Sequence, residues 1–282
     1  MSKSEIELPA IFDLEQLDLN LFRNNVTNTS WQRVFGGQLI GQSIAAACRT
    51  VKDRLPHSLH GYFLRAGDPR VPIIYQVETL RDGKRYSSRR VTAIQSCDTV
   101  FSIMASFQTE EQGAVDHQGT MPDVASPDKL TLEKRAIQPV FVEAPEFIRR
   151  HYGIELLAVE TGRYFGHKFE DGRIHVWIKT SAKLPDDPVL HLCALAYASD
   201  YPLLDSVTAR YGRKPFDRRM IPASLDHAMW FHRGFRADDW LLYAHDSPSA
   251  EGGRGITRGL IFKPDGTLVA SVAQEGSVRE RP

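Results

Sequence analysis

The hydrophobic positions of this chain fall into two similar series of short segments, separated by polar turns. In the first half they predict strands at 61–65, 72–80, 87–95 and 99–108; in the second half they predict strands at 228–232, 240–245, 255–262 and 267–274. Aromatic and β-branched residues suit a pleated surface, and the Pro264-Asp265-Gly266 turn favours a hairpin. Earlier strands are expected at 17–24 and 174–180, so each half predicts a sheet.

A run of small apolar residues lies in each half between the first expected strand and the rest. Residues 36–48 predict a helix enclosed by a sheet, although Gly41 weakens it by about 1 kcal/mol relative to alanine. Residues 189–198 predict its partner, which Asp187 caps and Pro188 opens. Each half therefore has the order strand, helix, strands, which is an α+β pattern with the helix against one face of a mostly antiparallel sheet.

Two short matches indicate that the halves are copies of one unit. Ser58-Leu59-His60 and Ser224-Leu225-Asp226 lie 166 residues apart, and Gln108 and Gln274 share this offset. Chance similarity of two sheet-rich halves is the alternative. The expected organisation is a first repeat at 1–112, a polar, proline-containing connection at 113–150 with some helix near its end, and a second repeat at 151–282.

Composition restricts the partners of the protein. The 282 residues carry 35 basic and 35 acidic side chains without a long run of one sign, which argues against a nucleic-acid-binding surface. No apolar stretch is long enough to span a bilayer, and the first residues lack the apolar core of a signal peptide. With no peroxisomal signal at the last residues, we expect a cytoplasmic protein. Cys48, Cys97 and Cys193 are expected to be buried packing residues.

Three polar residues of the second half are candidates for chemistry. Asp200 follows the second helix, Ser224 lies in an expected strand, and Gln274 ends a strand of small residues. A carboxylate, a hydroxyl and an amide can together hold and activate a water molecule. Each also has an ordinary structural interpretation, and spacing alone does not bring the three together.

The segment 222–232 is expected to be one strand, in which residues two apart share a face. Ser224, Asp226 and His232 would then point one way and His227 the other. This parity argues against joint metal binding by His227 and His232. It leaves Asp226 and His232 as a possible acid–base pair of a hydratase. The chain contains no Gly-x-Ser-x-Gly, His-Glu-x-x-His or phosphate-loop motif.

Several segments resemble the acyl-CoA thioesterase II family, whose members have a double hotdog fold. They cover nearly the whole chain in the family's order: 34–38 (VFGGQ), 57–65 (HSLHGYFLR), 77–83 (VETLRDG), 88–91 (SRRV), 197–200 (YASD), 225–232 (LDHAMWFH) and 274–276 (QEG). The resemblance implies hydrolysis of medium- to long-chain fatty acyl-CoA without a cofactor or a metal ion. Alternatives are a hotdog hydratase or dehydratase and a non-catalytic acyl-CoA-binding protein.

The resemblance also implies roles for individual residues. The family's catalytic Asp, hydroxyl residue and Gln fall on Asp200, Ser224 and Gln274, with Ser where bacterial relatives often have Thr. Backbone amides at a helix start, in either copy, are candidates to stabilise an oxyanion. Gly36 and Gly37 would let a carbonyl approach closely, and close helix packing is the alternative reason for these glycines. Val34 takes the place of Asp200 in the first copy at the 166-residue offset, so one catalytic centre per chain is expected. A homodimer or larger homo-oligomer is expected by analogy.

Overall fold

The computed structural model describes residues 7–25, 33–131, 152–215, 217 and 219–281. Within them, the first half of the chain forms a sheet with one long and one short helix. Its elements are α1 (Leu8–Phe12), β1 (Glu15–Asp18), β2 (Leu21–Arg23), α2 (Gly36–Cys48), β3 (Leu55–Phe63), β4 (Ile74–Asp82), β5 (Tyr86–Gln95) and β6 (Asp98–Gln108).

The second half repeats this plan and adds to it. Its elements are β7 (Ile154–Ala158), the 3₁₀ helix η1 (Thr161–Phe165), β8 (Ile174–Thr180), α5 (Pro188–Ser199), α6 (Asp205–Ala209), β9 (Met220–Ser224), β10 (Asp226–Phe231), β11 (Leu241–Glu251), β12 (Arg254–Phe262) and β13 (Leu268–Glu280). The α+β repeat predicted from the sequence is therefore present in both halves.

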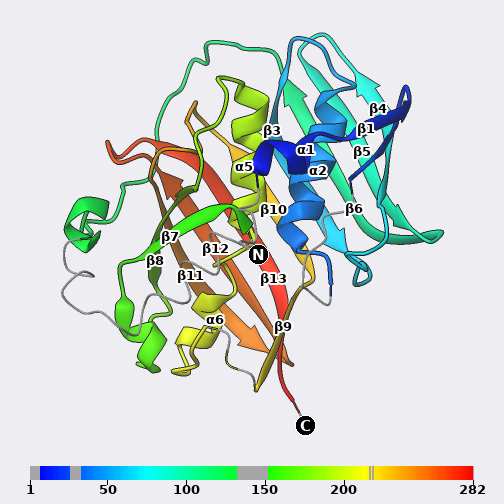
Figure 1. Ribbon diagram of the computed structural model, residues 1–282. Helices are drawn as coiled ribbons and strands as arrows, with labels where there is room; N and C mark the ends of the chain where they lie inside the picture. The colour runs from blue at the N-terminus through cyan, green and yellow to red at the C-terminus, as the bar shows by residue number, and fades with distance from the viewer. Residues whose placement is uncertain (1–6, 26–32, 132–151, 216, 218, 282) are drawn as a thin grey trace.

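The two halves join edge to edge in one antiparallel sheet (Figure 1). The strand order is β1-β2-β4-β5-β6-β3 in the first half and β10-β13-β12-β11-β8-β7 in the second, with β9 also paired to β13. Strands β3 and β10 form the seam, where Ala228 pairs with His60. The order reads the same from either end, so the halves are related by an approximate two-fold axis at this seam.

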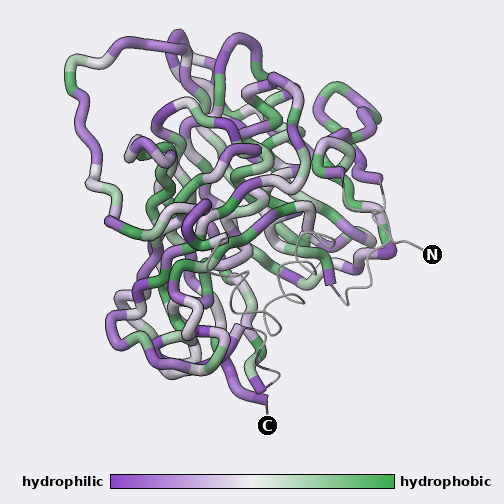
Figure 2. Tube along the Cα trace, turned by 60° about the vertical axis from the view of Figure 1, so that its left-hand side comes forward, coloured by the Kyte–Doolittle hydropathy of each residue, from purple (hydrophilic) through white to green (hydrophobic). Residues whose placement is uncertain are grey.

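Helices α2 and α5 pack against each other on one face of the sheet, as Figure 1 shows. Both helices have the expected bounds to within a residue. Helix α5 begins where expected because Asp187 Oδ1 accepts a hydrogen bond from Val189 N at 2.9 Å and Pro188 is its first residue. Gly37 allows the close approach of the helices: a Cβ there would lie 2.1 Å from the carbonyl oxygen of Tyr197. In Figure 2 hydrophobic segments gather inside the molecule, with hydrophilic loops around them.

The repeat does not follow one constant offset, contrary to the sequence interpretation. The last residues of the two helices, Cys48 and Ser199, lie 151 positions apart, whereas the positive-φ residues of the equivalent hairpin turns, Cys97 and Gly266, lie 169 apart. The segment that carries α6 is inserted between α5 and β9 and accounts for most of the difference. Gln108 also lies on the opposite face of β6 from fully buried Phe107.

Two smaller expectations also change. The single strand expected at 17–24 is the β1–β2 hairpin, which turns at Leu19 and Asn20. Cys193 is buried and Cys48 is partly buried, but Cys97 is exposed because it sits at the tip of the β5–β6 turn with φ of 69°. The expectation of a buried Cys97 was wrong. All three cysteines are free thiols.

The described part of the inter-domain connection lies on the second half of the sheet. Trp177 Nε1 donates to Ala125 O at 2.9 Å, and the Gln118 side chain bonds to Gly266 O and Leu268 N. Residues 127–131 form a helical turn. The later part of the connection, where more helix is expected, lies outside the described residues. Among the described helices, none combines the length and the hydropathy needed to cross a membrane.

Candidate functional site

Asp200, Ser224 and Gln274 meet at one end of the helix pair. The Ser224 hydroxyl donates to Asp200 Oδ1 at 2.9 Å, and the Gln274 amide nitrogen donates to Ser224 Oγ at 2.9 Å. Asp200 caps the C-terminus of α5, Ser224 ends β9, and Gln274 lies in β13. Three elements far apart in the sequence thus position the three candidates as one hydrogen-bonded chain.

The site is mostly enclosed. Asp200 is 8% exposed and Gln274 is 1% exposed, and Ser224 is partly buried. A carboxylate in such a place is costly unless hydrogen bonds or nearby dipoles compensate it. Ser224 supplies one hydrogen bond to Oδ1, and among the described residues none donates to Oδ2, which faces the start of helix α2.

Gly36 brings the start of α2 against the carboxylate. A Cβ at Gly36 would lie 2.6 Å from Asp200 Oδ2, and α2 begins there without a side-chain cap. The uncapped amides at a helix start carry partial positive charge and attract anions. Gly36 thus leaves room for the carboxylate, and Gly37 permits close packing of the two helices; the stabilisation of an oxyanion here stays a prediction.

A β-bulge places His227 beside this chain, which the sequence interpretation missed. Ser224 pairs with Gly276 and Ala228 pairs with Ala273, so four steps along one strand oppose three along the other. The extra residue turns both Ser224 and His227 towards the helices. The expectation that they point to opposite faces was wrong because the bulge interrupts the strand alternation. No residue type in this segment signals the bulge.

The His227 ring connects the site to α5. Its Nδ1 contacts Gln274 Oε1, and its Nε2 lies 2.9 Å from Ser199 Oγ. His227 is 1% exposed. Burial lowers the pKa of this imidazole below its usual 6.5, and the charges of Asp200 and Asp226 and the hydrogen bond to Gln274 oppose the shift.

A cluster of aromatic rings includes Tyr152, whose hydroxyl is close enough to feel the charge of Asp200. The ring of Phe35 lies 4.6 Å from that of Tyr152, whose ring lies 5.0 Å from that of Tyr201. Burial and the charge of Asp200 raise the pKa of the Tyr152 hydroxyl, so this hydroxyl remains neutral at pH 7. The charge of Arg33, whose guanidinium donates to Pro222 O at 2.9 Å, partly opposes this shift.

The alternative pair formed by Asp226 and His232 does not assemble. Asp226 Oδ1 accepts a hydrogen bond from Glu275 N at 2.8 Å, whereas His232 Nε2 lies 2.8 Å from Ser271 Oγ. Each side chain is held by a different partner on β13. This arrangement does not support an acid–base pair of the hydratase type.

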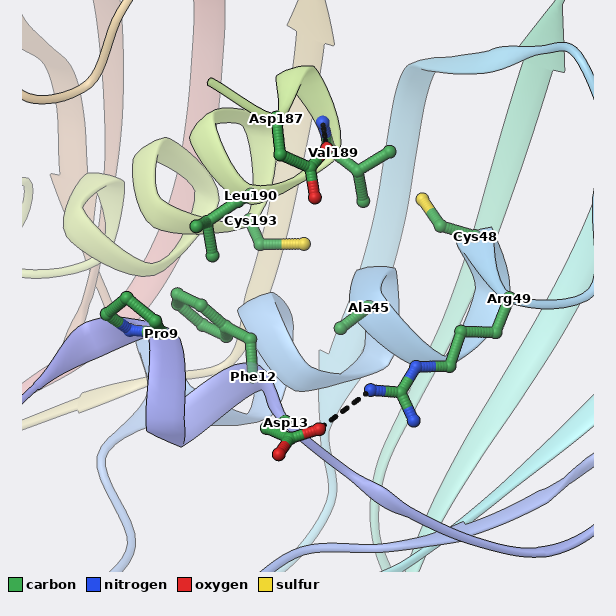
Figure 3. Close-up of a pocket in the computed structure, with 10 residues that line it drawn as sticks. All are labelled: Pro9, Phe12, Asp13, Ala45, Cys48, Arg49, Asp187, Val189, Leu190 and Cys193. Carbon is green, nitrogen blue, oxygen red and sulfur yellow. Dashed lines mark hydrogen bonds and ion pairs between the residues drawn. The ribbon is translucent and has the colours of Figure 1, made fainter. Parts of the chain in front are cut away.

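The other end of the helix pair differs from the site. Arg49 caps α2 as Asp200 caps α5, so Arg49 and not Val34 is the structural counterpart of Asp200. A pocket of about 390 Å³ lies at this end, between α1, α2 and α5 (Figure 3). The Arg49 guanidinium donates to Leu14 O and forms an ion pair with Asp13 at 3.3 Å. A guanidinium stays protonated and does not replace a carboxylate as a base.

Known proteins have similar sequences and similar folds. Residues 27–108 match the model of the acyl-CoA thioesterase N-terminal domain, and residues 147–277 match the acyl-CoA thioesterase model. Acyl-CoA thioesterase 2 of Haemophilus influenzae is 37% identical over 274 residues, which cover 95% of this chain and 96% of that protein.

Two solved structures extend the comparison. The acyl-CoA thioesterase II of Mycobacterium marinum is 42% identical, with a TM-score of 0.80, and the match covers 98% of this chain and 99% of that one. A conserved protein of unknown function with a hot dog fold from Alicyclobacillus acidocaldarius has a TM-score of 0.77 at 18% identity, covering 99% and 100% of the two chains. The latter likeness shows the double hotdog fold alone.

Proposed function

Because this chain belongs to the acyl-CoA thioesterase family and is a thioester hydrolase, we propose that Asp200, Ser224 and Gln274 are its catalytic residues. The observation that supports this most is the continuous hydrogen-bonded chain from Gln274 through Ser224 to Asp200. We also propose medium- to long-chain fatty acyl-CoA as substrates, which rests on the family resemblance.

In the proposed reaction, Asp200 acts as a general base on a water molecule. Ser224 occupies Oδ1, so Oδ2 is the oxygen that takes the proton. The water oxygen forms a bond to the thioester carbonyl carbon, and the carbon–sulfur bond then breaks. The coenzyme A sulfur leaves with the electron pair and receives the proton from Asp200. The products are the fatty acid and the free thiol.

The start of α2 is the proposed source of oxyanion stabilisation. Charge develops on the carbonyl oxygen as water attacks, and backbone amides at an uncapped helix start are suited to stabilise it. The nearness of Gly36 to Asp200 Oδ2 supports this proposal, because a carbonyl attacked by the water would lie close to both. The proposal needs no metal ion or organic cofactor.

The remaining expectations from the sequence stay proposals. One catalytic centre per chain is supported by the contrast between Asp200 and Arg49 at equivalent helix ends. Repeats at 1–112 and 151–282, joined by 113–150, are consistent with the two ranges that the family models match. We propose a cytoplasmic homodimer or larger homo-oligomer, by analogy with hotdog proteins.

Thiol release from palmitoyl-CoA and from a shorter acyl-CoA tests this proposal. Cys97 is exposed and would react with a thiol reagent, so all variants carry Cys97→Ser. We expect the Asp200→Asn substitution to lower kcat by about a hundredfold, the scale for loss of a general base. Asp13→Asn, at the other end of the helix pair, is the control and should retain kcat.

Each outcome bears on a different part of the proposal. A wild-type protein that releases no thiol from any acyl-CoA would contradict the substrates, and enoyl-CoA consumption without thiol release would indicate a hydratase. Equal kcat for the wild type and Asp200→Asn would leave the reaction standing but remove Asp200 from its proposed role.

A further inference from the structure

His227 has no part in the proposed reaction, yet its buried ring is inserted between Gln274 and α5. Its two nitrogens contact Gln274 Oε1 and Ser199 Oγ. The Ser199 hydroxyl also donates to Ala196 O at 2.9 Å. Both nitrogens of this buried ring therefore have a polar partner, as a buried imidazole requires.

Proton counting restricts the state of this ring. An amide oxygen only accepts hydrogen bonds, so a bond to Gln274 Oε1 requires a proton on His227 Nδ1. Since burial lowers the pKa of the imidazole, the ring is neutral at pH 7 and Nε2 carries a lone pair. The single Ser199 proton is then shared between Nε2 and Ala196 O, both 2.9 Å from Oγ, and below the pKa of the ring it goes to Ala196 O alone. The Nδ1 proton stays in place in both states.

We infer that His227, in its Nδ1–H tautomer, is a positioning residue that fixes the orientation of the Gln274 amide. The inference rests on the proposed function of Gln274. With Oε1 held by His227, the amide nitrogen must face Ser224 and donate to its oxygen. The Ser224 proton then has Asp200 Oδ1 as its acceptor, which orients the carboxylate.

The opposite tautomer shows what this orientation prevents. A lone pair on Nδ1 would require Gln274 to turn its amide nitrogen towards His227 and its oxygen towards Ser224. That oxygen would compete with Asp200 for the Ser224 proton.

The charged or titratable groups whose fields act on the ring are Asp200 at the end of α5 and Asp226 at the start of β10.

Substitutions that place or omit a donor at the Nδ1 position test the inference. The amide nitrogen of His227→Asn can occupy the Nδ1 position, whereas the longer side chain of His227→Gln reaches the Nε2 position, and His227→Leu has no donor. We expect kcat to fall by about tenfold to a hundredfold in the Leu and Gln variants, because a misplaced catalytic group costs up to about a hundredfold in rate. KM should change little. The Asn variant should retain most of the wild-type kcat.

Nitrogen NMR of the wild-type protein gives a second readout that does not depend on activity. We expect the His227 signal, assigned by its disappearance in His227→Asn, to show a protonated Nδ1 and an unprotonated Nε2 at pH 7. An unprotonated Nδ1 would overturn the inference. So would wild-type kcat in His227→Leu, or an Asn variant no better than the Gln variant when both are folded. If the wild type releases no thiol, the proposed function fails while the tautomer is still decided.

Discussion

Replacing each of two adjacent glycines by alanine should separate catalysis from stability. In Gly36→Ala the new Cβ would lie 2.6 Å from Asp200 Oδ2 and 2.9 Å from the ring of Phe63, and ordinary van der Waals contact begins at 3.4 Å. The carboxylate must therefore move by about 0.8 Å, and it can do so because it ends a side chain. A displacement near 1 Å costs on the order of a hundredfold in rate.

Gly37→Ala has the opposite expected effect. Its Cβ would lie 2.1 Å from the backbone oxygen of Tyr197, which α5 holds in place. The two helices must move apart, and such overpacking costs about 1–3 kcal/mol of unfolding free energy. At about 2–4 °C per kcal/mol, the Tm should fall by roughly 2–12 °C.

The two variants are compared by thiol release and by thermal unfolding. We expect Gly36→Ala to lose most of its kcat with a smaller fall in Tm than Gly37→Ala, because the atoms nearest its Cβ belong to side chains. Gly37→Ala should lose Tm and retain a larger share of kcat at 25 °C. Wild-type kcat in Gly36→Ala, or the same ratio of activity to stability in both variants, would refute the placement of Asp200 against the start of α2.

Two further substitutions address other regions. Arg49→Ala removes hydrogen bonds that hold the residues just after α1 to the end of α2, and it should lower the free energy of unfolding in urea by about 1–2 kcal/mol. We expect kcat within about twofold of the wild type; a large loss of kcat would argue that this end contributes to catalysis. Burial lowers the pKa of His245 well below 6.5, with Arg163 and His175 adding to the shift. Below about pH 6.5 the unfolded chain therefore binds more protons at this residue than the folded chain does. The free energy of unfolding decreases as the pH is lowered through this range. His245→Leu should reduce the loss of unfolding free energy between pH 7.5 and 5.5; an unchanged loss would contradict this assignment.

The sequence was most informative where local chemistry decides the structure. Asp187 and Pro188 set the start of α5, and runs of apolar residues located both helices and most strands. The repeat was visible because each copy uses the same order of elements. Asp200, Ser224 and Gln274 were found as candidates because polar residues at the edge of apolar segments need a reason to be there.

The rest depended on how elements pair, which residue patterns do not encode. The bulge between Ser224 and Ala228 exists only relative to β13, so strand alternation assigned His227 to the wrong face. The constant offset failed because an insertion after α5 has no counterpart in the first copy. It was this insertion that made Val34, rather than Arg49, seem to be the counterpart of Asp200.

The seam between β3 and β10 has a consequence for how the protein can change. In a dimer of identical subunits, every substitution would appear at both ends of the helix pair at once. Here the two copies are separate stretches of one chain, so a mutation alters one end and leaves the other as it was. Arg49 and Asp200 are an example, because they have opposite charges at equivalent positions of the two copies. The end that carries Arg49 can thus be redesigned by substitution without changing the residues around Asp200.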